Sequence, residues 1–211
     1  MSNLNINEIF YSLQGEAKTV GLPTVFVRLT GCPLRCTYCD TEYAFKGSNL
    51  MSIEVILNEV GQYNTPHVCV TGGEPLAQTN SLELLDALVS KGYQVSLETS
   101  GSIDVAPVNP KVSIVMDVKT PDSGESEQNL WSNMTQLSGK DQLKFVIGSR
   151  SDFDWSVEIL DQHPSEAEVL FSPVFGAVEP RDLAQWILDA KLNVRLQVQL
   201  HKLLWGDEQG R

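Results

Sequence analysis

The chain has 211 residues with 15 basic and 27 acidic side chains, so its formal net charge at pH 7 is −12. Hydrophobic residues make up 42% of it, a composition typical of globular proteins rather than of disordered or fibrous ones. No apolar run approaches the roughly 20 residues that a membrane-spanning helix needs. The acidic balance disfavours nucleic acid and anionic lipid, which attract clustered Lys and Arg. We therefore expect no nucleic-acid partner and no membrane.

The amino terminus has no basic segment of the kind that opens a secretory signal peptide. Residues 1–10 carry three Asn side chains and Glu8, with no Lys or Arg. We therefore expect a cytoplasmic protein. Thiols stay reduced in that compartment, which matters for the cysteines described below.

Strand-like and helical segments alternate along the chain. The expected strands are residues 24–29, 68–70, 94–98, 112–118, 142–147, 169–171 and 194–200. The expected helices are residues 52–63, 82–90, 128–137, 153–162 and 180–190. This alternation indicates an α/β fold with a parallel sheet and helical crossovers. A complete eight-unit barrel takes about 250 residues, so we expect an incomplete TIM-like barrel, with an open doubly wound sheet as the alternative.

Polar segments follow four of the expected strands. They are residues 31–32, 71–75, 99–101 and 119–121. In parallel sheets, binding and catalytic residues gather at the carboxyl ends of the strands. We expect these four segments to meet at one opening.

Three of the four cysteines are bunched in one short loop. Cys32, Cys36 and Cys39 form a C-x3-C-x2-C pattern, and thiolates at this spacing bind soft metals or iron–sulfur clusters. Three thiolates leave one iron of a four-iron cluster open to another ligand. A structural zinc ion would instead need a fourth ligand, for which the candidates are Cys69, His67, His163 and His201. Cys69 lies inside an expected strand and is interpreted as a small core residue.

The cysteine loop resembles the signature of the radical S-adenosylmethionine (SAM) superfamily. The aromatic residue of that signature is Tyr38, directly before Cys39. Residues 72–75 read Gly-Gly-Glu-Pro and are similar to the superfamily's GGEP motif, in which paired glycines let the backbone approach a ligand closely. The resemblance implies a [4Fe–4S] cluster whose open iron binds the amino and carboxylate groups of SAM, and a partial TIM-like barrel of the radical SAM type.

Further segments resemble the 7-carboxy-7-deazaguanine synthase family within that superfamily. They are Leu-Gln-Gly-Glu at 13–16, Arg28, Cys-Asp-Thr at 39–41, Glu-Thr-Ser-Gly at 98–101, Asp-Val-Lys at 117–119 and Gln-Leu-His-Lys at 199–202. The resemblance runs from about residue 7 to about residue 206. It implies one radical SAM domain over residues 1–211.

The resemblance implies a ring contraction of 6-carboxy-5,6,7,8-tetrahydropterin to 7-carboxy-7-deazaguanine with loss of ammonia, a step of queuosine and 7-deazapurine biosynthesis. On this resemblance, the reduced cluster would cleave SAM to a 5′-deoxyadenosyl radical, which would take a hydrogen from C6 of the substrate and later return it. The resemblance therefore implies that SAM is used catalytically and that Mg²⁺ assists. The cofactor supplies the difficult chemistry, and the protein binds and orients the reactants and excludes side reactions.

Site residues are carried over from the resemblance by position. The cluster is expected on Cys32, Cys36 and Cys39, and Mg²⁺ on the hydroxyl of Thr41, since hard cations take oxygen ligands. SAM is expected to contact Gly73, Glu98, Ser100, Asp117, Val118 and Lys119, with Ser172 and Pro173 on the adenine side. The pterin is expected to contact Leu13, Gln14, Gly15, Glu16, Arg28, Thr71 and His201.

Two other functions are also compatible with parts of the sequence. A glycyl-radical activase shares the cysteine loop and GGEP but acts on a protein and has no need of the residues at 13–16 or 39–41. A non-enzymatic zinc-binding module explains the cysteines alone. The resemblance further implies a homodimer and an electron donor such as flavodoxin or ferredoxin.

Overall fold

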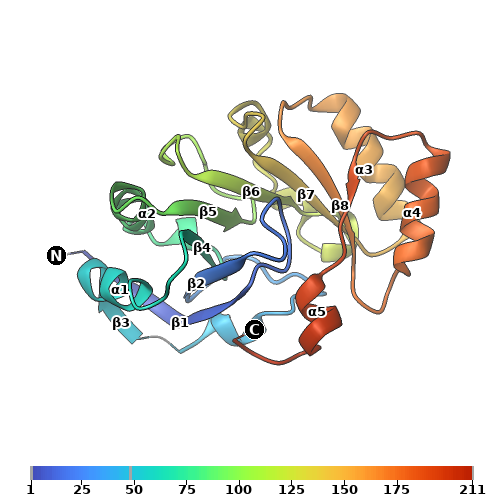
Figure 1. Cartoon of the computed structure of the whole chain (residues 1–211). Helices are drawn as coiled ribbons and strands as arrows, with labels where there is room; N and C mark the ends of the chain where they lie inside the picture. The colour runs from blue at the N-terminus through green and yellow to red at the C-terminus, as the bar shows by residue number, and fades with distance from the viewer. Residues whose placement is uncertain (1, 48, 211) are drawn as a thin grey trace.

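The structure is a computed structural model that describes residues 2–47 and 49–210. Its strands are β1 (Asn3–Leu13), β2 (Pro23–Leu29), β3 (Asn49–Ser52), β4 (His67–Gly72), β5 (Gln94–Thr99), β6 (Ser113–Val118), β7 (Gln142–Ile147), β8 (Glu168–Pro173) and β9 (Arg195–Leu196). Its α-helices are α1 (Ile53–Val60), α2 (Ser81–Ser90), α3 (Arg150–Gln162), α4 (Pro180–Asp189) and α5 (Leu200–Trp205). Figure 1 shows the order of these elements.

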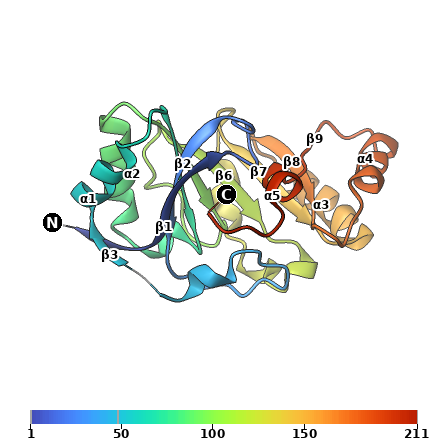
Figure 2. The ribbon, with the colours of Figure 1, turned by 60° about the horizontal axis from the view of Figure 1, so that its bottom comes forward.

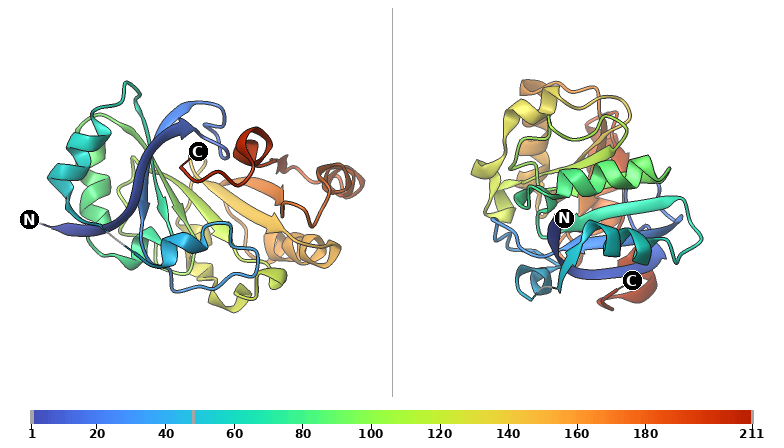
Figure 3. Two further views of the ribbon diagram at one scale, coloured as in Figure 1. Left: turned by 90° about the horizontal axis from the view of Figure 1, so that it is seen from below. Right: turned by 90° about the vertical axis from the view of Figure 1, so that its left-hand side faces the viewer.

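The strands of the described chain form one sheet in the order β3-β1-β2-β4-β5-β6-β7-β8-β9. From β2 to β9 every neighbouring pair is parallel, whereas β1 pairs antiparallel with both β2 and β3. The two edge strands, β3 and β9, do not pair with each other, so the barrel stays open. Figure 3 shows the sheet bent into an arc, with α1 and α2 towards one end and α3 and α4 towards the other. The predicted partial barrel is confirmed.

Six of the seven parallel strands, β2 and β4 to β8, match predicted strands with shifts at their ends, and the seventh, β9, is much shorter than predicted. The helices α1 to α4 also match predicted helices with shifts at their ends, and three of them begin at recognisable signals. Ser52 accepts a hydrogen bond from Val55 N at 3.3 Å, Ser149 accepts one from Asp152 N at 3.3 Å, and Pro180 occupies the first turn of α4.

Between the sheet and the helices lies a continuous apolar core. Phe145 of β7, Phe171 of β8 and Phe153 of α3 are all nearly inaccessible and meet edge to face, with ring centroids 5.5 and 5.7 Å apart. Such packing adds about 0.5–1.5 kcal/mol per pair beyond the burial of the rings. The opposite face of the sheet is therefore free to carry polar side chains.

The helix expected at residues 128–137 is wrong. The segment forms the short 3₁₀ helices η4 (Ser126–Gln128) and η5 (Trp131–Thr135). Side chains pull it out of a helix, because Asn129 bonds both the N–H and the carbonyl of Lys119, and Asn133 donates to the carbonyls of Gly101 and Ile103. Asn favours such local side-chain bonding over the helix interior.

The strand expected at residues 194–200 is mostly wrong. Only the two residues of β9 pair with β8. The backbone of Gln197 still donates to Phe171 O of β8 at 2.9 Å, while its side chain accepts from Ala17 N at 2.7 Å and donates to Ala17 O at 3.2 Å, which ties this segment to the loop after β1. Figure 2 shows the chain after α5 passing in front of the sheet.

Candidate active site

A cavity of about 690 Å³ lies along the inner face of the arc. Alternate residues of single strands line it, such as Val115 and Asp117 of β6 and Lys144 and Val146 of β7, which is the period of a strand face. The expected meeting of polar segments at the strand ends is confirmed for Cys32, residues 71–73, residues 99–100 and Lys119. Most of the predicted site residues line the cavity: Leu13, Gln14, Gly15, Glu16, Arg28, Cys32, Cys36, Cys39, Thr41, Thr71, Gly73, Glu98, Ser100, Asp117, Lys119 and His201.

The cysteine loop is fastened to the connection between β6 and β7. Thr37 donates both hydrogen bonds across this contact, from its N–H to Ser123 O at 3.0 Å and from its hydroxyl to Asp122 O at 2.6 Å. Arg35 N donates to Glu125 Oε1 at 2.6 Å. Tyr38 lies near Thr120, with 3.2 Å between their hydroxyl oxygens. The loop is thereby held over the cavity by another part of the chain.

The three loop thiols suit a cluster better than a single ion. Burial raises the pKa of each, and the charge of Lys119 nearby opposes that rise at all three. Within residues 2–47 and 49–210, no three His, Cys, Asp or Glu side chains lie close enough together to hold one metal ion. A cluster of several irons is wider and takes its thiolates from further apart. Cys69 is fully buried in β4, as predicted for a core residue.

The GGEP segment presses against the start of the cysteine loop. Gly73 N donates to Leu29 O at 3.1 Å, and Glu74 N donates to Gly31 O at 2.8 Å. A Cβ at Gly73 would collide with the carbonyl of Gly31, so only glycine fits. Glu74 is fully buried and accepts from Ser100 N at 2.6 Å, which joins the ends of β4 and β5.

Four charged side chains meet on the inner face. Lys144 Nζ lies 2.7 Å from Glu16 Oε2 and 3.7 Å from Asp117 Oδ2, and Lys119 Nζ lies 3.0 Å from the same Asp117 oxygen. Gln199 donates to Glu16 Oε1 at 2.8 Å. Burial by itself raises the pKa of Glu16, but Lys144 and the hydrogen bonds outweigh it and lower that pKa to about 2. Glu16 is therefore an anion at neutral pH.

Lys144 was not among the predicted site residues. It is the one charged side chain of β7 and stands between apolar residues, and a largely buried cation there needs polar partners.

Arg28 of β2 lines the cavity. Its Nε donates to Glu8 Oε1 at 2.8 Å, and the same oxygen accepts from the hydroxyl of Tyr43 at 2.8 Å. The guanidinium also lies over the rings of Phe10 and Tyr43, 5.6 and 5.7 Å from their centroids. Apart from the Nε bond, the guanidinium makes no hydrogen bond within the described chain, so its two terminal nitrogens stay free for a ligand.

A second polar group lies one strand further on. Thr71 donates to Glu98 Oε2 at 2.9 Å, and Gln14 Nε2 lies 3.5 Å from Glu98 Oε1. The glutamate thus connects a residue expected to contact substrate on β4 with one from the loop between β1 and β2.

Thr41 and Asp40 supply oxygen atoms beside the cysteine loop. The hydroxyl of Thr41 donates to Asp40 Oδ1 at 2.7 Å, and both residues line the cavity. A hydroxyl and a carboxylate side by side form the oxygen donor set that a hard cation prefers.

Three predicted contacts lie outside the cavity lining. Val118 is a buried core residue, because it occupies the opposite face of β6 from Asp117. Ser172 and Pro173 are buried at the end of β8, and the next two residues, Val174 and Phe175, line the cavity instead. The Ser172 hydroxyl is buried without a hydrogen-bond partner among the described residues.

Comparison with known proteins places these features in a known class. The family model described as the Radical SAM superfamily matches residues 26–123, which contain the cysteine loop and GGEP. In the structure of QueE from Escherichia coli, 26% identical, the fold agrees with a TM-score of 0.80 over 94% of this chain and 95% of that one. SuiB from Streptococcus suis, 14% identical, shares the fold with a TM-score of 0.59 over 83% of this chain and 50% of that one. The protein is a radical SAM enzyme, with a [4Fe–4S] cluster and SAM as cofactors.

The chain belongs to the 7-carboxy-7-deazaguanine synthase family. The family's member from Chlorobaculum tepidum is 42% identical over 97% of this chain and 96% of its own length, and the one from Koribacter versatilis is 43% identical over 97% and 98%. The predicted family, fold and enzyme class are confirmed. The readings as a zinc module and as a glycyl-radical activase find no support.

Proposed function

We propose that this enzyme converts 6-carboxy-5,6,7,8-tetrahydropterin to 7-carboxy-7-deazaguanine and ammonia in this cavity. The observation that carries the proposal is that the loop of residues 13–16, Arg28 and the three cysteines line one cavity. The reaction loses one ammonia and adds nothing, so it needs no second substrate. When bound, the cluster and SAM supply a 5′-deoxyadenosyl radical that exchanges a hydrogen with the pterin.

Arg28 binds the carboxylate of the pterin. Glu8 takes only its Nε, so the two terminal nitrogens can form a bidentate pair with a planar carboxylate. The aromatic rings below the guanidinium keep it from turning. Arg28 thereby fixes one end of the substrate.

The aminopyrimidinone edge of the pterin binds beside Gln14 and Glu16. Both side chains are buried, and each offers an acceptor to the N–H groups of that edge. Leu13, Gly15, Thr71 and His201 complete the surface around the ring. Because Glu16 is ionised, its hydrogen bonds to the substrate are charge-assisted.

SAM binds between the cysteine loop and the ends of β4, β5 and β6. Gly73 lines this part of the cavity together with Glu98, Ser100, Asp117 and Lys119. Val118, Ser172 and Pro173 lie outside the lining, and they support the neighbouring residues Asp117, Lys119 and Val174, which do line the cavity. Mg²⁺ takes the hydroxyl of Thr41 and keeps several waters.

The protein works in the cytoplasm as a single radical SAM domain over residues 1–211. Free thiols that must bind iron need a reducing compartment. No helix in the described residues is long and apolar enough to cross a membrane. One sheet and one core run through the described chain, as expected of a single domain.

A flavodoxin or ferredoxin donates the electron, and two copies of the chain associate. Large apolar side chains at the surface support the association, among them Leu188, Leu203 and Leu204, which are 69%, 64% and 51% exposed.

An anaerobic product assay tests the proposed function. The reconstituted enzyme is incubated with SAM, Mg²⁺, a reductant and 6-carboxytetrahydropterin, and the deazapurine is identified by mass. The proposal expects 7-carboxy-7-deazaguanine, formed faster with Mg²⁺ than without. Absence of this product, with an intact cluster, would refute it.

A further inference from the structure

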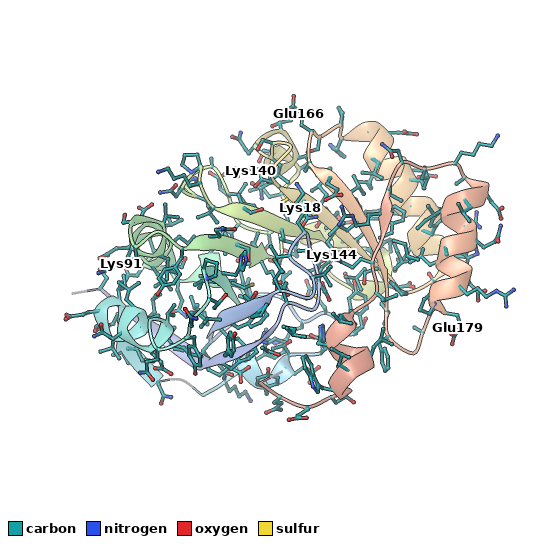
Figure 4. All side chains as sticks on the ribbon, viewed as in Figure 1. Lys18, Lys91, Lys140, Lys144, Glu166 and Glu179 are labelled. Atoms are coloured by element: carbon teal, nitrogen blue, oxygen red, sulfur yellow. The ribbon has the colours of Figure 1, made fainter. Side chains whose placement is uncertain are left out.

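Lys144 stands between two acidic side chains from different parts of the cavity. It lies on β7 directly opposite Asp117 of β6 in the sheet register, so both side chains share the inner face. Its ammonium is 2.7 Å from Glu16, which comes from the loop between β1 and β2, and 3.7 Å from Asp117. Figure 4 shows Lys144 near the middle of the sheet, far from Lys91 at the end of α2.

The two contacts of Lys144 differ in kind. The separation from Glu16 is that of a short charge-assisted hydrogen bond, whereas the separation from Asp117 exceeds hydrogen-bond distance. The ammonium carries three donors, so it can strengthen its contact with Asp117 when Glu16 is shared with another donor.

Asp117 also has an acceptor to spare. Its Oδ2 faces Lys119 and Lys144, while its Oδ1 is buried and has no hydrogen-bond partner among the described residues. A buried carboxylate oxygen without a donor is costly, and native proteins seldom keep one unless a ligand or water completes it. SAM carries hydroxyl and ammonium donors that can do so.

We propose that Lys144 is a positioning residue that couples binding of the pterin to binding of SAM. The inference rests on the proposed function, which puts Glu16 on the pterin side and Asp117 on the SAM side. When N–H groups of the pterin donate hydrogen bonds to Glu16, the contact of Lys144 with Glu16 weakens and its contact with Asp117 strengthens. This fixes the Asp117 carboxylate with Oδ1 available to SAM. By linkage, SAM strengthens pterin binding by the same factor.

The experiment measures this coupling without turnover. The holoenzyme with an oxidised cluster is titrated with SAM by anaerobic calorimetry, with and without saturating 6-carboxytetrahydropterin. The ratio of the two dissociation constants is the coupling factor. It is compared in the wild type, Lys144→Met, Lys144→Arg and the control Lys91→Met, whose side chain is exposed at the end of α2. Iron content per chain verifies that each variant is folded and loaded.

We expect a factor of at least about fivefold in the wild type, the lower range of measured couplings. It should fall to about one in Lys144→Met, while Lys91→Met keeps it and Lys144→Arg keeps most of it. A factor near one in the wild type, or an unchanged factor in Lys144→Met, would overturn the proposal. A wild type that binds the pterin and forms product but shows no coupling refutes this inference alone, whereas one that neither binds nor converts the pterin refutes the proposed function itself.

Discussion

The imidazole of His201 fills the space beside Gly15 into which any larger side chain would project. A Cβ at Gly15 would collide with Nδ1 of His201. The two segments are also joined through the backbone, since Leu200 N donates to Gly15 O at 3.0 Å. The start of α5 and the loop after β1 therefore form one unit at the cavity, although some 185 residues separate them in the chain.

Replacing Gly15 by alanine should displace His201. Overpacking a tight contact costs about 1–3 kcal/mol, and we expect the KM for the pterin to rise about tenfold or more while iron content stays normal. Anaerobic steady-state kinetics measure this. Gly139→Ala is the matched control, because its Cβ would lie 3.9 Å from the nearest atom. If Gly15 acts through His201, adding His201→Ala to Gly15→Ala changes KM little; a fully additive loss contradicts the account.

Arg28→Lys should separate substrate binding from SAM binding. A lysine ammonium can offer neither a bidentate pair nor the Nε bond to Glu8, so the KM for the pterin is expected to rise by about ten- to a hundredfold. The dissociation constant of SAM, measured by calorimetry, should stay the same. Arg181→Lys, at an exposed position of α4, is the control. An equal loss of affinity for both ligands would argue against the assigned role.

Most of the parallel sheet was predictable because apolar runs of that length have few alternatives. β1 was missed, although Leu4 and Ile6 are buried between more exposed Asn residues in a clear two-residue alternation. The polar Asn and Glu side chains hid this pattern. β3 is short and exposed, so its sequence holds little signal.

Site residues were predictable where a local sequence motif identifies them. They were not predictable where their role depends on contacts between distant parts of the chain. The cysteines and Gly73 carry local signatures. The pairings of Lys144 with Glu16 and of Glu8 with Arg28 depend on the sheet order, which the sequence leaves open. The same holds for residues 206–210, which line the cavity only because α5 turns the chain back across it.

Gly73→Ala should weaken cluster assembly. The added methyl group meets the carbonyl of Gly31 and lies 2.9 Å from Cys32 Cβ, so the first thiol of the loop must move. We expect iron content after anaerobic reconstitution to fall well below that of the wild type and of Gly139→Ala. Iron and sulfide analysis with visible absorbance gives the measurement. A normal iron content in Gly73→Ala would show that the close contact with Gly31 and Cys32 is not required for cluster assembly.

Glu16→Gln should lower stability by an amount that does not depend on pH near neutrality. Burial raises the pKa of Glu16, but Lys144 and the hydrogen bonds lower it overall from 4.5 to about 2, so the folded state favours the anion. This contribution, at most about 3 kcal/mol, is complete above pH 4.5 and is lost as pH falls towards about 2. The pKa of Lys144 is raised, so its charge persists until pH exceeds its ordinary range near 10.5.

Anaerobic urea denaturation of the wild type and Glu16→Gln should therefore give a difference in the free energy of unfolding that is constant from about pH 9 to about pH 5 and shrinks as pH falls below about 4.5. A difference that stays the same below about pH 4.5 would mean that Glu16 has the same pKa in the folded and unfolded states, and that Lys144 does not hold it as an anion.

If SAM is returned after each ring contraction, one molecule of SAM supports many turnovers. Counting the products formed when SAM is limiting measures this. The reconstituted enzyme is given excess 6-carboxytetrahydropterin and reductant with SAM at or below the enzyme concentration, and the deazapurine and ammonium are quantified together. We predict equal amounts of the two, in several-fold excess over SAM. No deazapurine, or deazapurine without matching ammonium, would contradict the account.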